Sequence, residues 1–191
     1  MPRRKIIMDE LDKKIVALFQ KDPTMSQKEL AEKIGISQPS ISARLRKLKE
    51  YGILSPCIGV SYKKAKLHMA KVDIDARDSN SILNIIRKCP YLWNAFLVSG
   101  KYNLTLFLIG EDISTLQSIV DSKIRPDPNV KDIDFSIVIS PEKDFVLSIE
   151  FSVPKAETSP CGAVCSECSQ YRTERCLGCP YTPFYKGTVW R

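Results

Sequence analysis

The chain has 191 residues, of which 43% are hydrophobic and 27% charged, an ordinary composition for a globular protein. It contains no run of eighteen apolar residues, and its basic N-terminus leads directly into a periodic, acidic helix without an apolar signal segment. The sequence therefore predicts neither a membrane span nor a secretory leader, and the expected location is the cytoplasm, without a membrane partner.

The net charge of +7 is concentrated in the first third of the chain. Residues 1–67 hold 15 Lys and Arg against 7 Asp and Glu, whereas residues 68–191 hold 14 against 15. A basic segment beside a nearly neutral remainder is expected when one module contacts a polyanion and the other has a separate task. A basic but merely solvated surface would have the same charge, so the motifs must decide between the two.

Two short helices are predicted before residue 36. The first spans about residues 9–20, where Leu11, Ile15 and Leu18 recur at helical spacing. The second begins at Ser26, which forms an S-x-x-E capping box with Glu29, and stops at Gly35, because a glycine adopts a left-handed turn at little cost.

A third helix, predicted from Gln38 to Tyr51, has the two faces of a DNA-recognition helix. Ile41, Leu45 and Leu48 form its buried stripe, and its other sides are polar and basic. Small side chains near its start let the backbone approach a groove, and basic residues further along reach phosphates or guanine edges. The predicted DNA-binding residues are Gln38, Ser40, Ser42, Ala43, Arg44, Arg46 and Lys47. A three-helix module that binds an acidic protein is the alternative.

The stretch from Gly35 to Ile53 resembles the helix-turn-helix of the Lrp/AsnC (feast/famine) transcription regulators. It carries the pattern GIS-x-x-S-I-S-x-R-L-x-x-L-x-x-x-G-I. The resemblance implies an archaeal-type regulator with a winged helix-turn-helix in residues 1–53, followed by a connecting strand or linker in residues 54–67.

Residues 68–153 are predicted to form an α+β domain with the ferredoxin-like βαββαβ order. Strands are expected at 68–75, 92–99, 103–109 and 133–139, with helices around 82–89 and 113–124 between them. An added edge strand is expected at 145–153. Because the second and third strands are apolar on both faces, a partner sheet should cover one of them, which predicts a homodimer or a higher homo-oligomer. The resemblance implies the same dimerisation, and it makes this domain the effector-binding one.

The turn between the second and third strands is similar to the family's (T/S)-G-x-Y/F-D segment, which lies near an amino-acid effector pocket. The resemblance implies a small-molecule effector site at Ser99, Gly100, Tyr102 and Asn103. Asn103 stands where the family usually has Asp, so an acceptor for an ammonium group is lost and an ordinary amino-acid effector is put in doubt. A hairpin that needs Gly100 and Asn103 for positive φ is the structural alternative.

Five of the seven cysteines lie in the C-terminal tail, residues 154–191, with the spacing C-x3-C-x2-C-x7-C-x2-C. The predicted ligands of zinc or an iron–sulfur cluster are Cys161, Cys165, Cys168, Cys176 and Cys179, and metal-free redox thiols are the third alternative. Five thiols exceed the four of a tetrahedral site, so a spare thiol such as Cys161 predicts a redox sensor as well as a structural staple. Cys57 and Cys89 are interpreted as core residues.

Taken together, these patterns predict a DNA-binding transcription regulator, not an enzyme, that binds double-stranded operator DNA as a dimer or higher oligomer. An effector, the metal or redox state of the cysteines, or both would modulate it. The alternative is an enzyme like the siroheme-type tetrapyrrole decarboxylases, because some proteins that resemble this family have that activity. Such chemistry needs several His and Arg in the effector domain, and the chain has a single histidine, His68.

Overall fold

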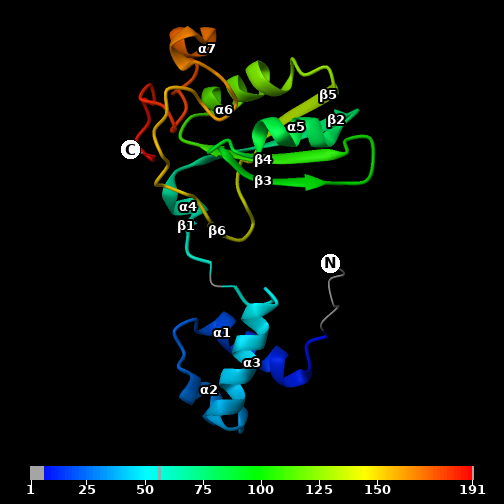
Figure 1. The fold of residues 1–191 in the computed structure, drawn as a ribbon, viewed down its shortest axis with the longest axis vertical. Helices are drawn as coiled ribbons and strands as arrows, with labels where there is room; N and C mark the ends of the chain where they lie inside the picture. The colour runs from blue at the N-terminus through cyan, green and yellow to red at the C-terminus, as the bar shows by residue number, and fades with distance from the viewer. Residues whose placement is uncertain (1–6, 56, 191) are drawn as a thin grey trace. The chain divides into compact units, whose positions relative to one another are not determined.

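A computed structural model describes residues 7–55 and 57–190, which form two compact units divided between Cys57 and Ile58 (Figure 1). The first unit contains the three predicted helices, α1 (Glu10–Lys21), α2 (Gln27–Ile34) and α3 (Gln38–Glu50). In the part of the chain that the structure describes, no helix is long and apolar enough to cross a membrane.

The ends of the helices in the first unit follow from their capping residues. Ser26 and Glu29 form the predicted capping box of α2, and Gly35 ends this helix in the left-handed region at φ 79°. Ser37 caps α3, and its side chain accepts a hydrogen bond from the amide of Ser40. A second capping box, formed by Asp9 and Asp12, starts α1 and was not predicted from the sequence.

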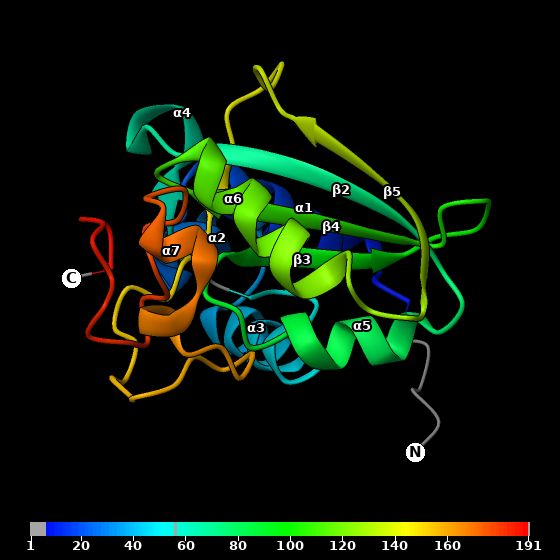
Figure 2. The same cartoon turned by 90° about the horizontal axis from the view of Figure 1, so that it is seen from above.

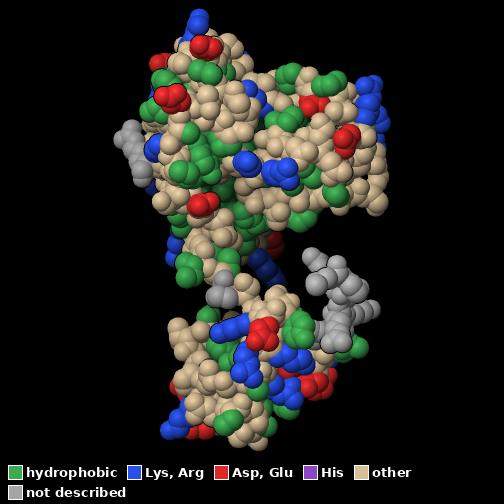
Figure 3. Space-filling model, viewed as in Figure 1, with side chains coloured by type: hydrophobic (Ala, Val, Ile, Leu, Met, Phe, Trp, Pro, Cys, Tyr) green, Lys and Arg blue, Asp and Glu red, His purple; other side chains and the backbone are tan. Residues whose placement is uncertain are grey.

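The core of the first unit is a small apolar cluster with one charged side chain buried beside it. Ile15, Leu30, Ile41 and Leu48 are fully buried, so the predicted stripe of α3 is confirmed. Asp12 is also fully buried. On the face drawn in Figure 3, Lys and Arg side chains of this unit are interspersed with Asp and Glu side chains.

The second unit contains the predicted ferredoxin-like domain. Its elements are β2 (His68–Ala76), α5 (Ser79–Ile86), β3 (Leu92–Leu97), β4 (Leu104–Gly110), α6 (Ile113–Ile119) and β5 (Val130–Ile137). The strands pair antiparallel in the order β3-β4-β2-β5, and α5 and α6 lie on the same face of the sheet (Figure 2). The predicted second helix continues beyond α6 as one turn of π-helix, η1 (Val120–Ile124).

Two sequence predictions for this unit are wrong. Helix α5 ends at Ile86, so Cys89 lies beyond it, in the turn before β3. The expected edge strand at 145–153 is reduced to β6 (Val146–Leu147), which pairs with β1 (Val60–Ser61) in a separate two-stranded sheet. The reason is the preceding turn, where Asp144 accepts a hydrogen bond of 2.6 Å from the hydroxyl of Ser61 and directs the chain toward β1.

The expected linker therefore packs with the second unit from Ile58 onward. Helix α4 (Tyr62–Ala65) follows β1, and Tyr62 packs with Met69, Ile109 and Leu147 on the sheet face opposite α5 and α6. This cluster covers one end of that face. Three residues near the end of β3 remain exposed, with 43%, 65% and 42% of their surface accessible: Phe96, Leu97 and Val98.

The C-terminal tail packs against the ferredoxin-like domain and is part of the same unit. It contains a short 3-10 turn, η2 (Cys165–Glu167), and one turn of helix, α7 (Ser169–Arg172), near α6 (Figure 1). Tyr185 and Trp190 are buried in the main core, where the ring of Trp190 lies 5.2 Å from that of Tyr91. These two aromatic residues of the tail thus extend the core of the domain.

Replacing Asp12 with alanine should lower the free energy of unfolding of the first unit by about 2 kcal/mol, because it removes a capping-box residue and a buried partner of Arg44. Native-state hydrogen exchange of amides in α1 and α3 measures this quantity for the first unit alone. The matched control is Lys13→Ala, which breaks an exposed pair with Glu10 and should cost less than about 1 kcal/mol. Equal losses in the two variants would contradict the role of Asp12.

Candidate DNA-binding surface and cysteine-lined cavity

The predicted DNA-binding residues occupy the exposed side of α3. Of the seven, Arg44 is partly buried. The other six are exposed: Gln38, Ser40, Ser42, Ala43, Arg46 and Lys47. Four of the seven line a surface cavity of about 380 Å³ together with Asp9: Ser40, Ala43, Arg44 and Lys47. The structure thus brings part of the predicted set together on one accessible surface.

Arg44 also has a structural contact within the first unit. Its Nη1 lies 2.6 Å from Asp9 Oδ2 and 2.7 Å from Asp12 Oδ1, so it joins the start of α1 to α3. Hydrogen bonds to Asp9 and Asp12 raise the pKa of the Arg44 guanidinium. The pKa of Asp9 is lowered from its ordinary value, first by the hydrogen bond from the Asp12 amide and then by that from Arg44. Arg44 orients α3, and its contact with DNA stays a prediction.

Asn103, predicted in the effector loop, bridges two backbone segments of the domain. Its Oδ1 accepts a hydrogen bond of 3.0 Å from the amide of Ala76, and its Nδ2 donates one of 2.8 Å to the carbonyl of the same residue. An ionised aspartate could accept but not donate, so the hydrogen bond to the Ala76 carbonyl requires the amide of asparagine. Asn103, directly before β4, thus connects the start of β4 to Ala76, the last residue of β2.

The other effector residues lie around the same hairpin. Tyr102 donates a hydrogen bond of 3.0 Å to Asp132 Oδ2, and Lys101 Nζ lies 2.7 Å from the same oxygen. Ser99 and Gly100 are exposed at the tip, where Gly100 has φ +128°. The loop is therefore anchored to β5 at its base, and its tip is accessible. Effector binding at these four residues stays a prediction.

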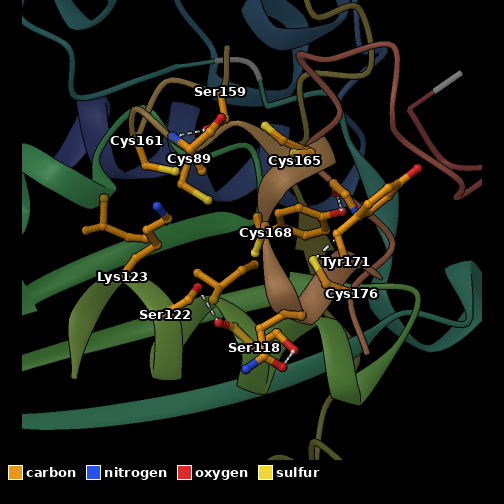
Figure 4. A pocket seen from close by; sticks show the side chains of 17 residues that line it. Cys89, Ser118, Ser122, Lys123, Ser159, Cys161, Cys165, Cys168, Tyr171 and Cys176 are labelled. Carbon is orange, nitrogen blue, oxygen red and sulfur yellow. Dashed lines mark hydrogen bonds between the residues drawn. The ribbon is translucent and has the colours of Figure 1, made fainter. Parts of the chain in front are cut away.

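All five cysteines of the tail line one cavity of about 60 Å³, and Cys89 lines it with them (Figure 4). Cys89 is partly buried, whereas Cys57 is exposed, so the interpretation of Cys57 as a core residue is wrong. The sequence pattern did not predict Cys89 as a member of this group. A signal was available, because the tripeptide Cys-Pro-Tyr occurs twice, at residues 89–91 and 179–181.

Of the six cysteines around the cavity, Cys165 is buried and the other five are partly buried. Burial raises the pKa of Cys89 to about 12, that of Cys176 to about 11 and that of Cys179 to about 12. A reactive redox cysteine has a lowered thiol pKa, and burial acts in the opposite direction at these three residues. In residues 7–55 and 57–190, no three His, Cys, Asp or Glu side chains lie close enough together to hold one metal ion.

Buried polar groups of the domain hold the tail beside this cavity. The Tyr91 hydroxyl donates to the carbonyl of Gly178 at 2.6 Å, and the Ser118 hydroxyl donates to that of Arg175 at 2.9 Å. The Leu177 amide donates to Thr115 Oγ1 at 2.8 Å. Gly178 itself has φ +86°, a conformation that favours glycine, and this turn brings its carbonyl to Tyr91.

The last residues of the tail are held by Glu111, which follows β4. Its carboxylate accepts hydrogen bonds from the amides of Thr188 and Val189, at 2.7 and 3.0 Å, and from the hydroxyl of Tyr185. Burial raises the pKa of Glu111, but these hydrogen bonds together hold it below its ordinary value. Glu111 is therefore a charged acceptor for the tail backbone at neutral pH.

Comparisons with known proteins identify both domains. Residues 8–55 match the family model for winged helix-turn-helix DNA-binding, and residues 69–146 match that for the Lrp/AsnC ligand binding domain. The chain therefore carries an Lrp/AsnC ligand binding domain after a winged helix-turn-helix. It is a DNA-binding transcription regulator of this type, with the family's ligand-binding domain.

Curated relatives and solved structures agree with this assignment. The transcriptional regulator AzlB of Bacillus subtilis is 27% identical over 145 residues, which cover 72% of this chain and 92% of AzlB. The leucine-responsive regulatory protein of Rhizobium meliloti is 27% identical over 148 residues, covering 73% and 94%. Escherichia coli AsnC has the same fold, with a TM-score of 0.63, 21% identity and coverage of 75% and 99%.

These matches also bear on three earlier expectations. The ligand-binding match ends at residue 146, before the cysteine-rich tail, so the role of the tail stays a prediction. Relatives occur in Bacillus, Rhizobium and Pyrococcus, and an archaeal subtype likewise stays a prediction. The matched relatives are regulators, so this Lrp/AsnC protein is not an enzyme of the tetrapyrrole decarboxylase kind.

Replacing Asn103 with aspartate should lower the free energy of unfolding of the second unit by about 1–3 kcal/mol, because the carbonyl of Ala76 loses its donor and faces a carboxylate. Urea denaturation followed by tryptophan fluorescence measures the change. Asn94→Asp is the matched control, because the Asn94 side chain is exposed and only accepts, from the amide of Ala95. Similar stabilities for the two variants would contradict the bridging role of Asn103.

Replacing Glu111 with glutamine should loosen the end of the tail and shift the emission of Trp190, now 1% exposed, to longer wavelength. The pKa of Glu111 is lower in the folded state than in the unfolded state. Its contribution to the stability of the docked tail is therefore present above the unfolded pKa of about 4.3 and is lost as the pH falls through the folded-state pKa. The emission difference from the parent protein should therefore disappear in acid.

A Trp93→Phe background isolates the signal of Trp190, and Glu142→Gln, at an exposed loop residue, serves as the charge-matched control. An emission difference that persisted unchanged below pH 3 would contradict the assigned role of the Glu111 carboxylate.

Proposed function

We propose that this Lrp/AsnC regulator binds operator DNA as a dimer or higher oligomer through the exposed side of α3. The observation that carries the proposal is the division of α3 into a fully buried apolar stripe and an accessible side that bears Ser40, Arg46 and Lys47. A recognition helix must be supported on one side by its domain and expose its other side to the major groove.

Dimerisation is supported by the apolar residues left exposed near the end of β3. Phe96, Leu97 and Val98 are consecutive, and β3 is an edge strand of the sheet. An edge strand has unpaired backbone groups, so an apolar edge is best satisfied by a second copy of the chain. Two copies related by a two-fold axis would read a roughly palindromic operator with half-sites about one helical turn apart.

The effector is proposed to be a small molecule bound near the hairpin of Ser99, Gly100, Tyr102 and Asn103. Support comes from the ligand-binding match and from a solved regulator of Neisseria meningitidis with 21% identity and a TM-score of 0.63, which was crystallised with L-Met. In this chain the side chain of Asn103 is already engaged by Ala76, which favours an effector that does not require a carboxylate there. Calorimetric titration with amino acids tests this part: strong binding of an ordinary amino acid would contradict it.

A metal centre bound by the tail cysteines, either zinc or an iron–sulfur cluster, is proposed as a second modulator of DNA binding. Because the tail is packed on the domain that carries β3, a change in the cysteine site has a physical route to dimer packing. The support is structural adjacency, and DNA affinity measured with and without bound metal decides whether the two sites are coupled.

Arg46→Ala and Lys47→Ala should each weaken DNA binding by roughly 5- to 150-fold if the lost contact is to a base. If the lost contact is to a phosphate, the slope of log affinity against log salt concentration should become shallower by about 1. The probe is a set of duplexes selected by the protein from a random library, and the mass of the complex reports the number of chains bound. Arg125→Ala, at an exposed position of the second unit, is the charge-matched control. Unchanged affinity and salt slope in both variants would exclude α3 as the reading helix.

A further inference from the structure

Cys89 and the five tail cysteines surround the same small cavity, although they come from different parts of the chain. Cys89 lies in the turn between α5 and β3, some seventy residues before Cys161, and Figure 4 shows it close to Cys161 at this cavity. We propose that Cys89 is a ligand of an iron–sulfur cluster that it holds together with cysteines of the tail. This proposal deepens the proposed metal site of the tail and rests on it.

The arrangement of the thiols favours a cluster over a single zinc ion. Zinc in a structural site needs four donors at about 2.3 Å from one centre. The described residues contain no group of three potential ligands that converge in this way, yet six cysteines line one cavity of about 60 Å³. An iron–sulfur cluster has a core of several iron and sulfide atoms, so its cysteines lie around the core and need not approach one another closely.

The local sequence at Cys89 matches that at one of the tail cysteines. Both Cys89 and Cys179 are followed by Pro-Tyr. A Cys-Pro pair also ends the ligand run of bacterial ferredoxins. The two tripeptides therefore provide equivalent ligand positions on opposite parts of the fold.

Other sulfurs at the cavity also accept hydrogen bonds. The amide of Gly178 donates to Cys176 Sγ at 3.4 Å, and the hydroxyl of Thr182 donates to Cys165 Sγ at 3.7 Å. Donors directed at ligand sulfurs stabilise the negative charge of a metal–thiolate site and tune its potential. Such contacts are expected around a cluster and are not required for packing a neutral thiol.

The wall opposite the tail supplies a positive charge. Lys123 lines the cavity and belongs to the π-helical turn η1, next to Ser122, which lines it as well (Figure 4). Four thiolates exceed the charge of the common cluster cores, so a nearby ammonium group offsets the excess. A π-helical turn is a less stable backbone form that is often found at functional sites, and here it carries both of these residues to the cavity.

The test uses the full chain, purified without oxygen and reconstituted with ferrous iron and sulfide. Bound iron, acid-labile sulfide and visible absorbance are measured for the parent protein and for Cys89→Ala, Cys179→Ala and Cys57→Ala. The parent and Cys57→Ala should bind equal amounts of iron and sulfide, because Cys57 is exposed and outside the cavity. Cys89→Ala and Cys179→Ala should lose most of both and the visible band.

Three results would overturn the proposal: zinc without sulfide in the parent protein, no retained metal at all, or parent-like iron and sulfide in Cys89→Ala. Far-UV circular dichroism checks that each variant is folded. If Cys89→Ala does not fold, Cys89→Ser replaces it, since a serine oxygen can still bind iron and should change the electron paramagnetic resonance spectrum of the reduced cluster. An unchanged spectrum would overturn the role of Cys89.

Affinity for the selected duplexes is measured on the same samples and separates this inference from the proposed function. If the parent protein binds the selected duplexes but holds no iron–sulfur cluster, the inference about Cys89 is contradicted and the proposed DNA binding stands. Failure of the parent protein to select any duplex contradicts the proposed DNA reading by α3 and leaves the cluster result to stand by itself.

Discussion

The architecture of the second unit depends on polar groups that the ferredoxin-like domain buries and that the C-terminal tail satisfies. Thr115 is fully buried and Ser118 nearly so, and both hydrogen-bond to the backbone of the tail. The Thr115 hydroxyl also donates to Asp112 within the domain, whereas a Ser118 hydroxyl left buried without a partner would cost about 1–3 kcal/mol. Tyr91 and Glu111 add two further anchors, one beside the cysteines and one at the chain end. For this reason the tail and the domain form one body, although the family match ends before the tail.

This docking also explains how a cysteine site in the tail has a route to the rest of the regulator. The turn that carries Cys89 leads directly into β3, and the carbonyl of Cys89 accepts a hydrogen bond of 3.0 Å from the amide of Leu92, the first residue of that strand. The exposed apolar residues lie near the other end of β3. A ligand that fixes Cys89 against the tail therefore acts on the same strand that we propose for contact between two copies. Truncation of the tail is a poor probe of this coupling, because it would also remove Trp190 from the core.

In the first unit, the basic residues of α3 have two different roles: Arg44 holds the helix in place within the domain, and Arg46 is proposed to contact DNA. Arg44 is held by Asp9 and by the buried Asp12, so it keeps α3 in place against α1. Arg46 is exposed and further along the helix. The sequence pattern alone treats these residues as equivalent basic positions, since both lie outside the apolar stripe. Their difference arises from the N-terminal cap of α1, whose two carboxylates reach α3 across the fold.

The sequence by itself determined the helices of the first unit, the ferredoxin-like strand order and the family, because these follow from local periodicity, from capping residues such as Ser26 and Ser37, and from Gly35. Only the tertiary structure decided which residues meet across long distances along the chain. Cys89 was interpreted as part of a helix because it continues the spacing of Ile82 and Ile86, but α5 ends early and the residue faces the tail. The final strand is short because the preceding turn, held by Ser61 and Asp144, directs the chain toward β1. The side chain of Asn103 is bonded to the backbone of Ala76. Periodicity records which side of an element is apolar, whereas the partner that covers that side is chosen by packing of the whole chain.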